Sequence, residues 1–174
     1  TCGVFGDESG SGKGLVIKLL TNALTIHFPF GTGGSPVAGS TITLPNANWH
    51  HVAYRKNAAN PSSFDKFLDG VKTQISTSIT LISGGGGVIH AFSDPNGGGG
   101  TGPFRGAMHK TGMFLRALTD PEISSLAGSS APDQLSGCEL SWRMDGDSPE
   151  TDDSGNGRAG TVSGSGWTLV ASPG

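Results

Sequence analysis

The sequence has few charged residues and no cluster of basic ones. Charged side chains make up 14% of the 174 residues, and the formal net charge is −3. A protein that binds nucleic acid presents a face or stripe of lysine and arginine to the phosphates. No run of these residues occurs here. We therefore expect no nucleic-acid partner.

Long hydrophobic runs are missing as well. Apolar residues make up 34% of the chain. The longest candidate runs, residues 14–20 and 37–44, are far shorter than the roughly 20 residues of a membrane-spanning helix. We therefore expect no membrane insertion.

Cysteine is scarce, and the chain contains only Cys2 and Cys138. The two are either unrelated buried thiols or a disulfide pair. The even number, and the place of Cys2 at the start of a glycine-rich chain, favour a bridge. Such a bridge would close a loop of more than about 100 residues and stabilise by up to about 4–5 kcal/mol in the chain-entropy model. It would also place the protein outside a reducing cytosol.

Glycine is abundant, with 30 residues, and many Ser, Thr, Asn and Pro residues accompany it. The glycines follow no three-residue period, which excludes collagen. The composition is typical of short strands joined by tight turns. The length suits one two-layer core, so we predict a single all-β domain over residues 1–174.

Alternation of apolar and polar residues predicts the strands. Residues 14–20 and 23–30 form a predicted hairpin, and Asp69-Gly70 is a tight-turn signal between two further strands. The other predicted strands are 41–44, 49–56, 64–69, 71–82, 88–92, 104–115, 138–144 and 161–170.

One short helix is predicted. Thr119 suits the N-cap, Pro121 suits the first turn, and Glu122 stands three residues after Thr119, as in a capping box. Gly128 ends the helix. Residues 129–137 then form a connector.

Two parts of the chain carry a family pattern. Trp-His-His-Val-Ala at 49–53 is followed by Phe-Leu-Asp-Gly at 67–70, and Phe-Arg-Gly-Ala-Met at 104–108 leads to Arg-Ala-Leu-Thr at 116–119. With this spacing, residues 14–127 resemble laminin-G-like domains. The resemblance implies a concanavalin A-like jelly-roll β-sandwich with one short helix. Its signature positions here are Trp49, His51, Asp69, Gly70, Gly106, Arg116, Leu118 and Glu122.

A third segment stands in an unexpected place. Leu-Ser-Trp-Arg-Met-Asp at 140–145 and Asp-Ser-Gly-Asn-Gly at 153–157 resemble the family's opening strands, and residues 1–13 leave little room for such strands ahead of Gly14. Either the domain is permuted, with 138–174 as its displaced opening, or a strand is missing from the chain. A missing strand is either supplied by a neighbouring copy or absent because the upstream residues were simply cleaved or left out. An incomplete edge exposes backbone hydrogen-bonding groups, which favours completion by a neighbouring copy.

Acidic side chains gather after residue 144, and the resemblance implies calcium near this segment. Calcium takes about six to eight oxygen ligands. His109 stands where the family has an aspartate, and an imidazole is a poor calcium ligand, so a solvated loop is the alternative. The candidate calcium ligands are Asp145, Asp147, Asp152, Asp153 and Asn156.

Patterns for other chemistry are absent. His50 and His51 are adjacent, so on a strand they point to opposite faces and do not chelate zinc together. No Glu-x-Asp-x-Glu run supplies the close carboxyl pair of a retaining glycosidase, and no Gly-x-Ser-x-Gly elbow occurs. We expect that the chain is not an enzyme.

Two functions remain, and both predict an extracellular or virion-surface location. The first is a structural or adhesion subunit of a virion surface or extracellular filament, which forms a homo-oligomer or larger assembly. The displaced opening motif supports it, and so does the similarity of the tail to laminin-G-like proteins of phages and aquatic bacteria. The second is an independent carbohydrate-binding module, assisted by calcium. Its candidate sugar-stacking aromatics, each of which fits the core better, are Tyr54, Phe64, Phe92 and Trp167.

Overall fold

The computed structural model describes residues 2–9, 13–19, 25–27, 42–57, 63–75, 90–91, 107–145 and 150–161. The described residues form strands, one α-helix and one 3-10 turn, as expected for an all-β chain with a short helix. The chain groups into two compact units. Unit 1 comprises Thr1–Leu68 and Lys72–Arg105, and unit 2 comprises Asp69–Val71 and Gly106–Gly174. A single domain over the whole chain stays a prediction.

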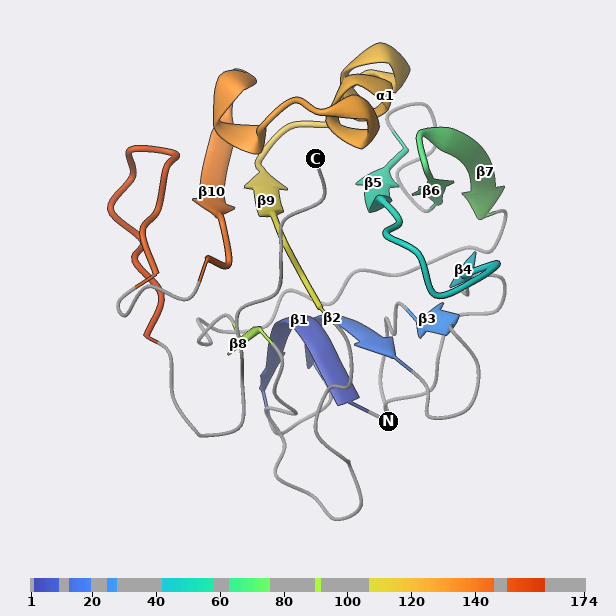
Figure 1. Ribbon diagram of the computed structural model, residues 1–174, viewed down its shortest axis with the longest axis horizontal. Coiled ribbons are helices and arrows are strands. Elements are labelled where there is room, and N and C mark those ends of the chain that lie inside the picture. Colours follow the sequence, from blue (N-terminus) through green and yellow to red (C-terminus); the bar gives the residue numbers. More distant parts are fainter. Residues whose placement is uncertain are drawn as a thin grey trace. The chain divides into compact units, whose positions relative to one another are not determined.

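A five-stranded sheet in unit 1 has the order β4-β3-β2-β1-β8 (Figure 1). The predicted hairpin is present, because β2 and β3 pair antiparallel with Lys18 opposite His27. The side chains of β1, β2, β3 and β8 lie outside the described part of the chain. The strands are β1 (Cys2–Ser9), β2 (Lys13–Leu19), β3 (Thr25–His27), β4 (Ile42–Thr43) and β8 (His90–Ala91).

The expectation that residues 1–13 leave little room for strands ahead of Gly14 is wrong. β1 spans eight residues and pairs antiparallel with β2, from Cys2 opposite Leu19 to Ser9 opposite Lys13. The sequence of β1 contains glycine and acidic residues, which are depleted in strands. Its composition therefore does not predict a strand. The register also shifts between Gly3 and Phe5, which breaks the simple alternation.

A three-stranded sheet has the order β5-β6-β7. β5 (Val52–Lys56) and β6 (Phe64–Leu68) pair antiparallel along their whole length, and β7 (Val71–Ile75) follows through the predicted turn. Asp69 and Gly70 both have positive φ, 50° and 77°, as a tight two-residue hairpin turn requires. The turn belongs to unit 2, as does the helix that contains Ser124. A Cβ on Gly70 would lie 3.3 Å from Ser124 Cα, so the turn packs against this helix.

A carboxylate is buried in the β5–β6 pair. Asp65 is 2% exposed and lies opposite Arg55, whose guanidinium pairs with it. Asn57 Nδ2 also donates to Asp65 Oδ1 at 3.1 Å. The guanidinium carbon of Arg55 lies 5.0 Å from the ring centre of Phe67, a side chain with no exposed surface. The ion pair and the ring therefore form one buried stack.

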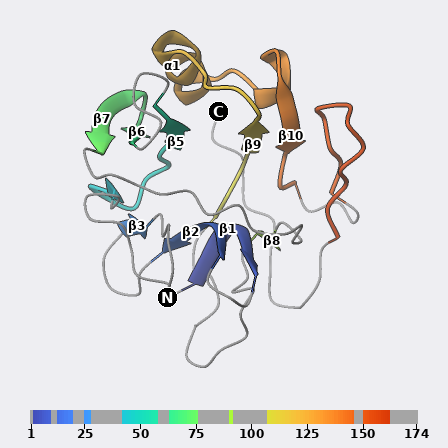
Figure 2. The same cartoon turned by 180° about the vertical axis from the view of Figure 1, so that it is seen from behind.

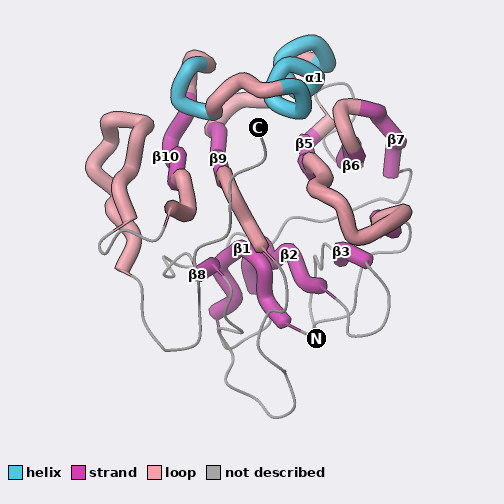
Figure 3. The backbone as a smooth tube through the Cα atoms, in the orientation of Figure 1, coloured by secondary structure: helices cyan, strands magenta, loops and turns pink. Residues whose placement is uncertain are grey.

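Unit 2 contains β9 (Thr111–Phe114), the helix α1 (Asp120–Gly128), a 3-10 turn η1 (Pro132–Gln134) and β10 (Cys138–Trp142). The predicted helix start is confirmed: Glu122 N donates to Thr119 Oγ1 at 3.4 Å, and Thr119 N donates to Glu122 Oε2 at 2.7 Å. Figure 3 shows α1 and η1 in cyan, joined by a short loop. No helix in the described part of the chain has the length and apolar character to cross a membrane.

Several predicted strands are shorter than expected. Within the described part of the strand predicted at 104–115, residues 107–110 are irregular and β9 begins at Thr111. The strand predicted at 49–56 begins at Val52. The predicted strand 161–170 lies almost entirely outside the described residues.

Candidate functional site

The site is built on the antiparallel ribbon of β9 and β10, which lie side by side in both views (Figures 1 and 2). The register places Cys138 opposite Phe114 and Ser141 opposite Gly112. Gly112 lies directly against η1, because a Cβ there would come within 2.5 Å of Pro132 Cβ. The missing side chain thus lets η1 pack onto the ribbon.

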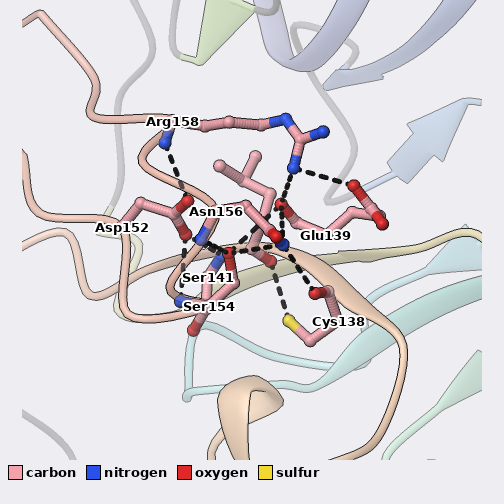
Figure 4. Close-up of polar contacts among 8 residues, drawn as sticks. Cys138, Glu139, Ser141, Asp152, Ser154, Asn156 and Arg158 are labelled. Atoms are coloured by element: carbon pink, nitrogen blue, oxygen red, sulfur yellow. Dashed lines mark hydrogen bonds and ion pairs between the residues drawn. The ribbon is translucent and has the colours of Figure 1, made fainter.

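Residues 150–161 fold back on β10, and Asp152 organises this loop (Figure 4). Asp152 Oδ1 accepts hydrogen bonds from the backbone N–H groups of Ser141 and Ser154, both at 3.0 Å. Its Oδ2 accepts from Arg158 N at 2.9 Å. Burial raises the pKa of Asp152, but the hydrogen bonds from Ser154, Ser141 and Arg158 outweigh burial, so this pKa lies below its usual value.

The other end of the loop is fastened to the side chains and carbonyls of β10. The indole Nε1 of Trp142 donates to Arg158 O at 2.8 Å, and Gly160 lies close against the indole ring. Arg158 also forms an ion pair with Glu139 at 2.7 Å. Asn156 Nδ2 donates to Cys138 O at 3.1 Å (Figure 4). The loop is therefore held at both ends by bonds to one strand.

Replacing Asp152 by alanine is expected to lower the free energy of unfolding by about 1–3 kcal/mol, because three backbone N–H groups lose their acceptor. Urea denaturation followed by circular dichroism measures the change. The adjacent acid is a matched control. Asp153→Ala removes only a pair with Arg143, whose side chain is 60% exposed, and should cost under about 1 kcal/mol. Equal effects of the two variants would contradict the role of Asp152.

A cavity of about 350 Å³ lies beside the ribbon, within unit 2. Its walls come from the residues before β9, from η1, from β10 and from the turn at residue 153. Such a volume lies at the lower end of ligand pockets in general. The polar residues that line it are His109, Lys110, Asp133, Ser141, Arg143 and Asp153.

The charges of the cavity are balanced. Arg143 forms an ion pair with Asp153, and Ser141 Oγ donates weakly to Asp133 Oδ1 at 3.4 Å. Burial lowers the pKa of His109, Lys110 lowers it further, and Asp145 acts in the opposite direction, so the imidazole is neutral at neutral pH. The lining offers both hydrogen-bond donors and hydrogen-bond acceptors, which suits an uncharged polar ligand such as a polyol.

Arg116 joins the helix to the connector that leads into β10. Its Nη1 and Nη2 donate to the two carboxylate oxygens of Glu122 at 2.9 and 2.6 Å. Its Nε donates to Ser136 O at 2.8 Å. The hydrogen bond from Arg116, together with that from Thr119 N, lowers the pKa of Glu122 to about 2.

The Glu122 interactions predict a pH dependence. Because the pKa of Glu122 falls from its usual 4.5 to about 2 in the folded chain, its contribution is complete above about pH 4.5. That contribution is lost as the pH falls toward 2. We expect the stability difference between the wild type and Glu122→Gln to be constant from pH 7 to 5 and to shrink below. Urea titrations at pH 7, 5, 4 and 3 test it, and a difference that does not change with pH would contradict the assignment.

The chain was compared with protein families, curated proteins and solved structures. A laminin-G family model, described as the concanavalin A-like lectin/glucanases superfamily, matches residues 2–124. The chain belongs to this superfamily. The strand-rich structure with one short helix agrees with the predicted concanavalin A-like sandwich. No curated protein and no solved structure matches the chain.

The signature positions of the concanavalin A-like family lie in different surroundings. Asp69 and Gly70 form the turn, Leu118 is buried at 8% exposure, and Arg116 and Glu122 form the ion pair described above. His51 is half-buried just before β5. Gly106 lies outside the described residues.

The signature position Trp49 does not lie in the core. Its side chain is 43% exposed in the irregular segment that precedes β5, and the core of that sheet is instead supplied by Phe64 and Phe67. The alternation of the strand begins only at Val52, so the tryptophan precedes the paired residues.

The predicted disulfide partners are placed only in part. Cys138 is a free cysteine in the structure, and the side chain of Cys2 lies outside the described part, so the bridge stays a prediction. Burial raises the pKa of the Cys138 thiol, while a backbone hydrogen bond with Leu140 acts in the opposite direction. Counting the free thiols of the denatured, unreduced chain tests the bridge.

The described candidate calcium ligands mostly bind the protein itself. Asp152 accepts from backbone N–H groups, Asp153 pairs with Arg143, and Asn156 donates to carbonyls of β10. Asp147 lies outside the described residues. Within the described ranges, no group of three or more His, Cys, Asp or Glu side chains could hold a metal ion. Calcium binding stays a prediction.

The sequence alone did not predict the cavity or the contacts of Arg116 with Glu122 and Ser136. The residues that line the cavity come from four separate segments, so no local sequence motif predicts it. The sequence pattern marks Arg116 only as a family position, although an arginine six residues from a glutamate can form a bidentate pair with it.

Proposed function

We propose that this chain is a non-catalytic structural or adhesion subunit of an extracellular or virion-surface assembly. The observation that carries the proposal is the pairing of β10 with β9. β9 belongs to the part of the chain that matches the family, and β10 lies beyond that part. An edge strand completed by a separate segment is a natural point of connection between copies.

The use of the carboxylates supports a non-catalytic role. A glycoside hydrolase needs two carboxyl groups directed at one bond. Here most described carboxylates are engaged by the protein itself. The pairs are Asp65 with Arg55, Glu122 with Arg116, Asp153 with Arg143 and Glu139 with Arg158, and Glu150 accepts from Met144 N.

The solution mass of the purified chain tests the proposal. Light scattering over a range of concentrations, with negative-stain images of the same samples, is expected to give multimers, rings, sheets or fibres. A stable monomer whose mass does not change with concentration would refute it.

A second candidate is a carbohydrate-binding module, and the cavity beside the ribbon favours it. Mixed donors and acceptors in about 350 Å³ fit a single sugar ring better than a long chain. A glycan screen with and without calcium tests this candidate and the calcium prediction together. Binding that Ser141→Ala weakens would support the cavity, and binding that the substitution leaves unchanged would place the sugar elsewhere.

A further inference from the structure

Residues 138–145 and 150–161, the described part of the segment 138–161 and called here the C-terminal lobe, are held together by contacts among themselves. Asp153 N donates to Ser141 O at 2.9 Å. Ser154 Oγ donates to Glu139 O at 3.2 Å (Figure 4). Ion pairs join Arg143 to Asp153 within the same segment. These bonds, with those of Asp152 and Trp142 above, need no residue outside the lobe. The lobe therefore keeps its internal structure wherever it docks.

The lobe docks on the rest of unit 2 mainly through a backbone ladder. β10 pairs with β9 from Cys138 opposite Phe114 to Trp142 opposite Thr111. A ladder of this kind recognises backbone groups and register, so β9 of an identical chain offers the same partner as β9 of the same chain. The acceptor is thus available in every copy.

The connector between the helix and the lobe is held closed by Arg116. Besides its bond to Ser136 O, Arg116 lies against Gly137, since a Cβ on this glycine would come within 3.3 Å of Arg116 Nε. Gly137 has φ +75°, which turns the chain into β10. Glu122 holds the guanidinium in place from the helix side. Removing Arg116 takes away the contacts that hold the connector at Ser136 and Gly137, without touching the β9–β10 ladder.

We infer that the C-terminal lobe is exchanged between copies: it docks on β9 of a second copy of this chain, with residues 129–137 as the hinge and Arg116 as the clasp. The inference rests on the proposed assembly function and names its contact. Exchange in both directions gives a closed dimer, whereas exchange in one direction joins copies into an open row. The same contact thus accounts for either a dimer or a filament.

A native cysteine provides the test. Because Cys138 lies opposite Phe114, Phe114→Cys is expected to form a disulfide across the β9–β10 pair. The substitution is made with Cys2→Ser, which removes the other thiol. After oxidation, non-reducing gels separate a cross-link within one chain from a cross-link between chains. We expect dimers and larger products that increase with concentration, and about tenfold more of them when Arg116→Ala is added.

Arg143→Ala is the matched control, because the ion pair of Arg143 is with Asp153, which belongs to the same lobe. It should leave the fraction of intermolecular product unchanged. Cross-links that stay within one chain at every concentration, in folded Arg116→Ala, would overturn the exchange. Assemblies seen by light scattering would then still support the proposed function through another contact, and monomers in both assays would refute both proposals.

A second variant covers the case in which Arg116→Ala does not fold. Deleting Ser129 and Ser130 shortens the hinge, and a short hinge favours exchange. All cross-links of this variant are expected between chains. A folded monomer with an intramolecular cross-link would again overturn the inference.

Discussion

Replacing Phe67 by alanine is expected to lower the free energy of unfolding by about 3–5 kcal/mol. The ring has no exposed surface, so its loss leaves a cavity in the β5–β6 pair. It also removes the surface on which the Arg55 guanidinium rests at 5.0 Å, an interaction that contributes about 0.5–2 kcal/mol. Urea denaturation followed by circular dichroism measures the loss.

Two further variants sharpen the Phe67 prediction. Phe67→Leu keeps most of the apolar volume and should cost clearly less than Phe67→Ala. Val71→Ala serves as the control, because Val71 is 70% exposed and its truncation should change the stability by less than about 0.5 kcal/mol. A Phe67→Ala cost as small as that of Val71→Ala would show that the ring is not part of a packed core.

Replacing Asp65 by alanine is expected to cost about 3–5 kcal/mol as well, for an electrostatic reason. The carboxylate is 2% exposed, and the side chain of Arg55 is only 13% exposed. Without Asp65, the largely buried guanidinium loses this counter-charge, and Asn57 Nδ2 loses this acceptor. The free energy of unfolding in urea is again the measurement.

A double variant separates the charge from the packing. Arg55→Met with Asp65→Leu replaces the ion pair by apolar side chains of similar size, which is often neutral in buried positions. We expect the double variant to recover most of the stability that Asp65→Ala loses. A double variant as unstable as the single one would mean that the pair specifies the strand register rather than compensating a buried charge.

Features with a local cause were predictable from the sequence. The start of α1 follows from Thr119 and Glu122 three residues apart, because both capping bonds form within one turn. The turn at Asp69-Gly70 follows from the tolerance of these residue types for positive φ. The family pattern predicted the β-sandwich fold, because the spacing of the motifs reflects the order of the strands.

Features that depend on distant partners were not predictable. The Arg55–Asp65 pair requires the β5–β6 register, which the sequence of either strand alone does not determine. The sequence predicts Asp152 as a metal ligand, whereas in the structure its carboxylate accepts hydrogen bonds from backbone N–H groups. Every residue type except proline carries such a group, so the sequence does not identify these partners. β1 was hidden because pairing with β2 overrides the weak strand preference of its glycine and acidic residues.

The contact between Gly112 and Pro132 constrains how this chain diverges over evolution. A methyl group at residue 112 would stand 2.5 Å from Pro132 Cβ, closer than two carbon atoms approach without bonding. Any larger residue at 112 therefore requires a smaller or displaced residue at 132. We expect the two positions to be inherited as a pair, so that a mutation at 112 is tolerated only in descendants whose proline has already been replaced.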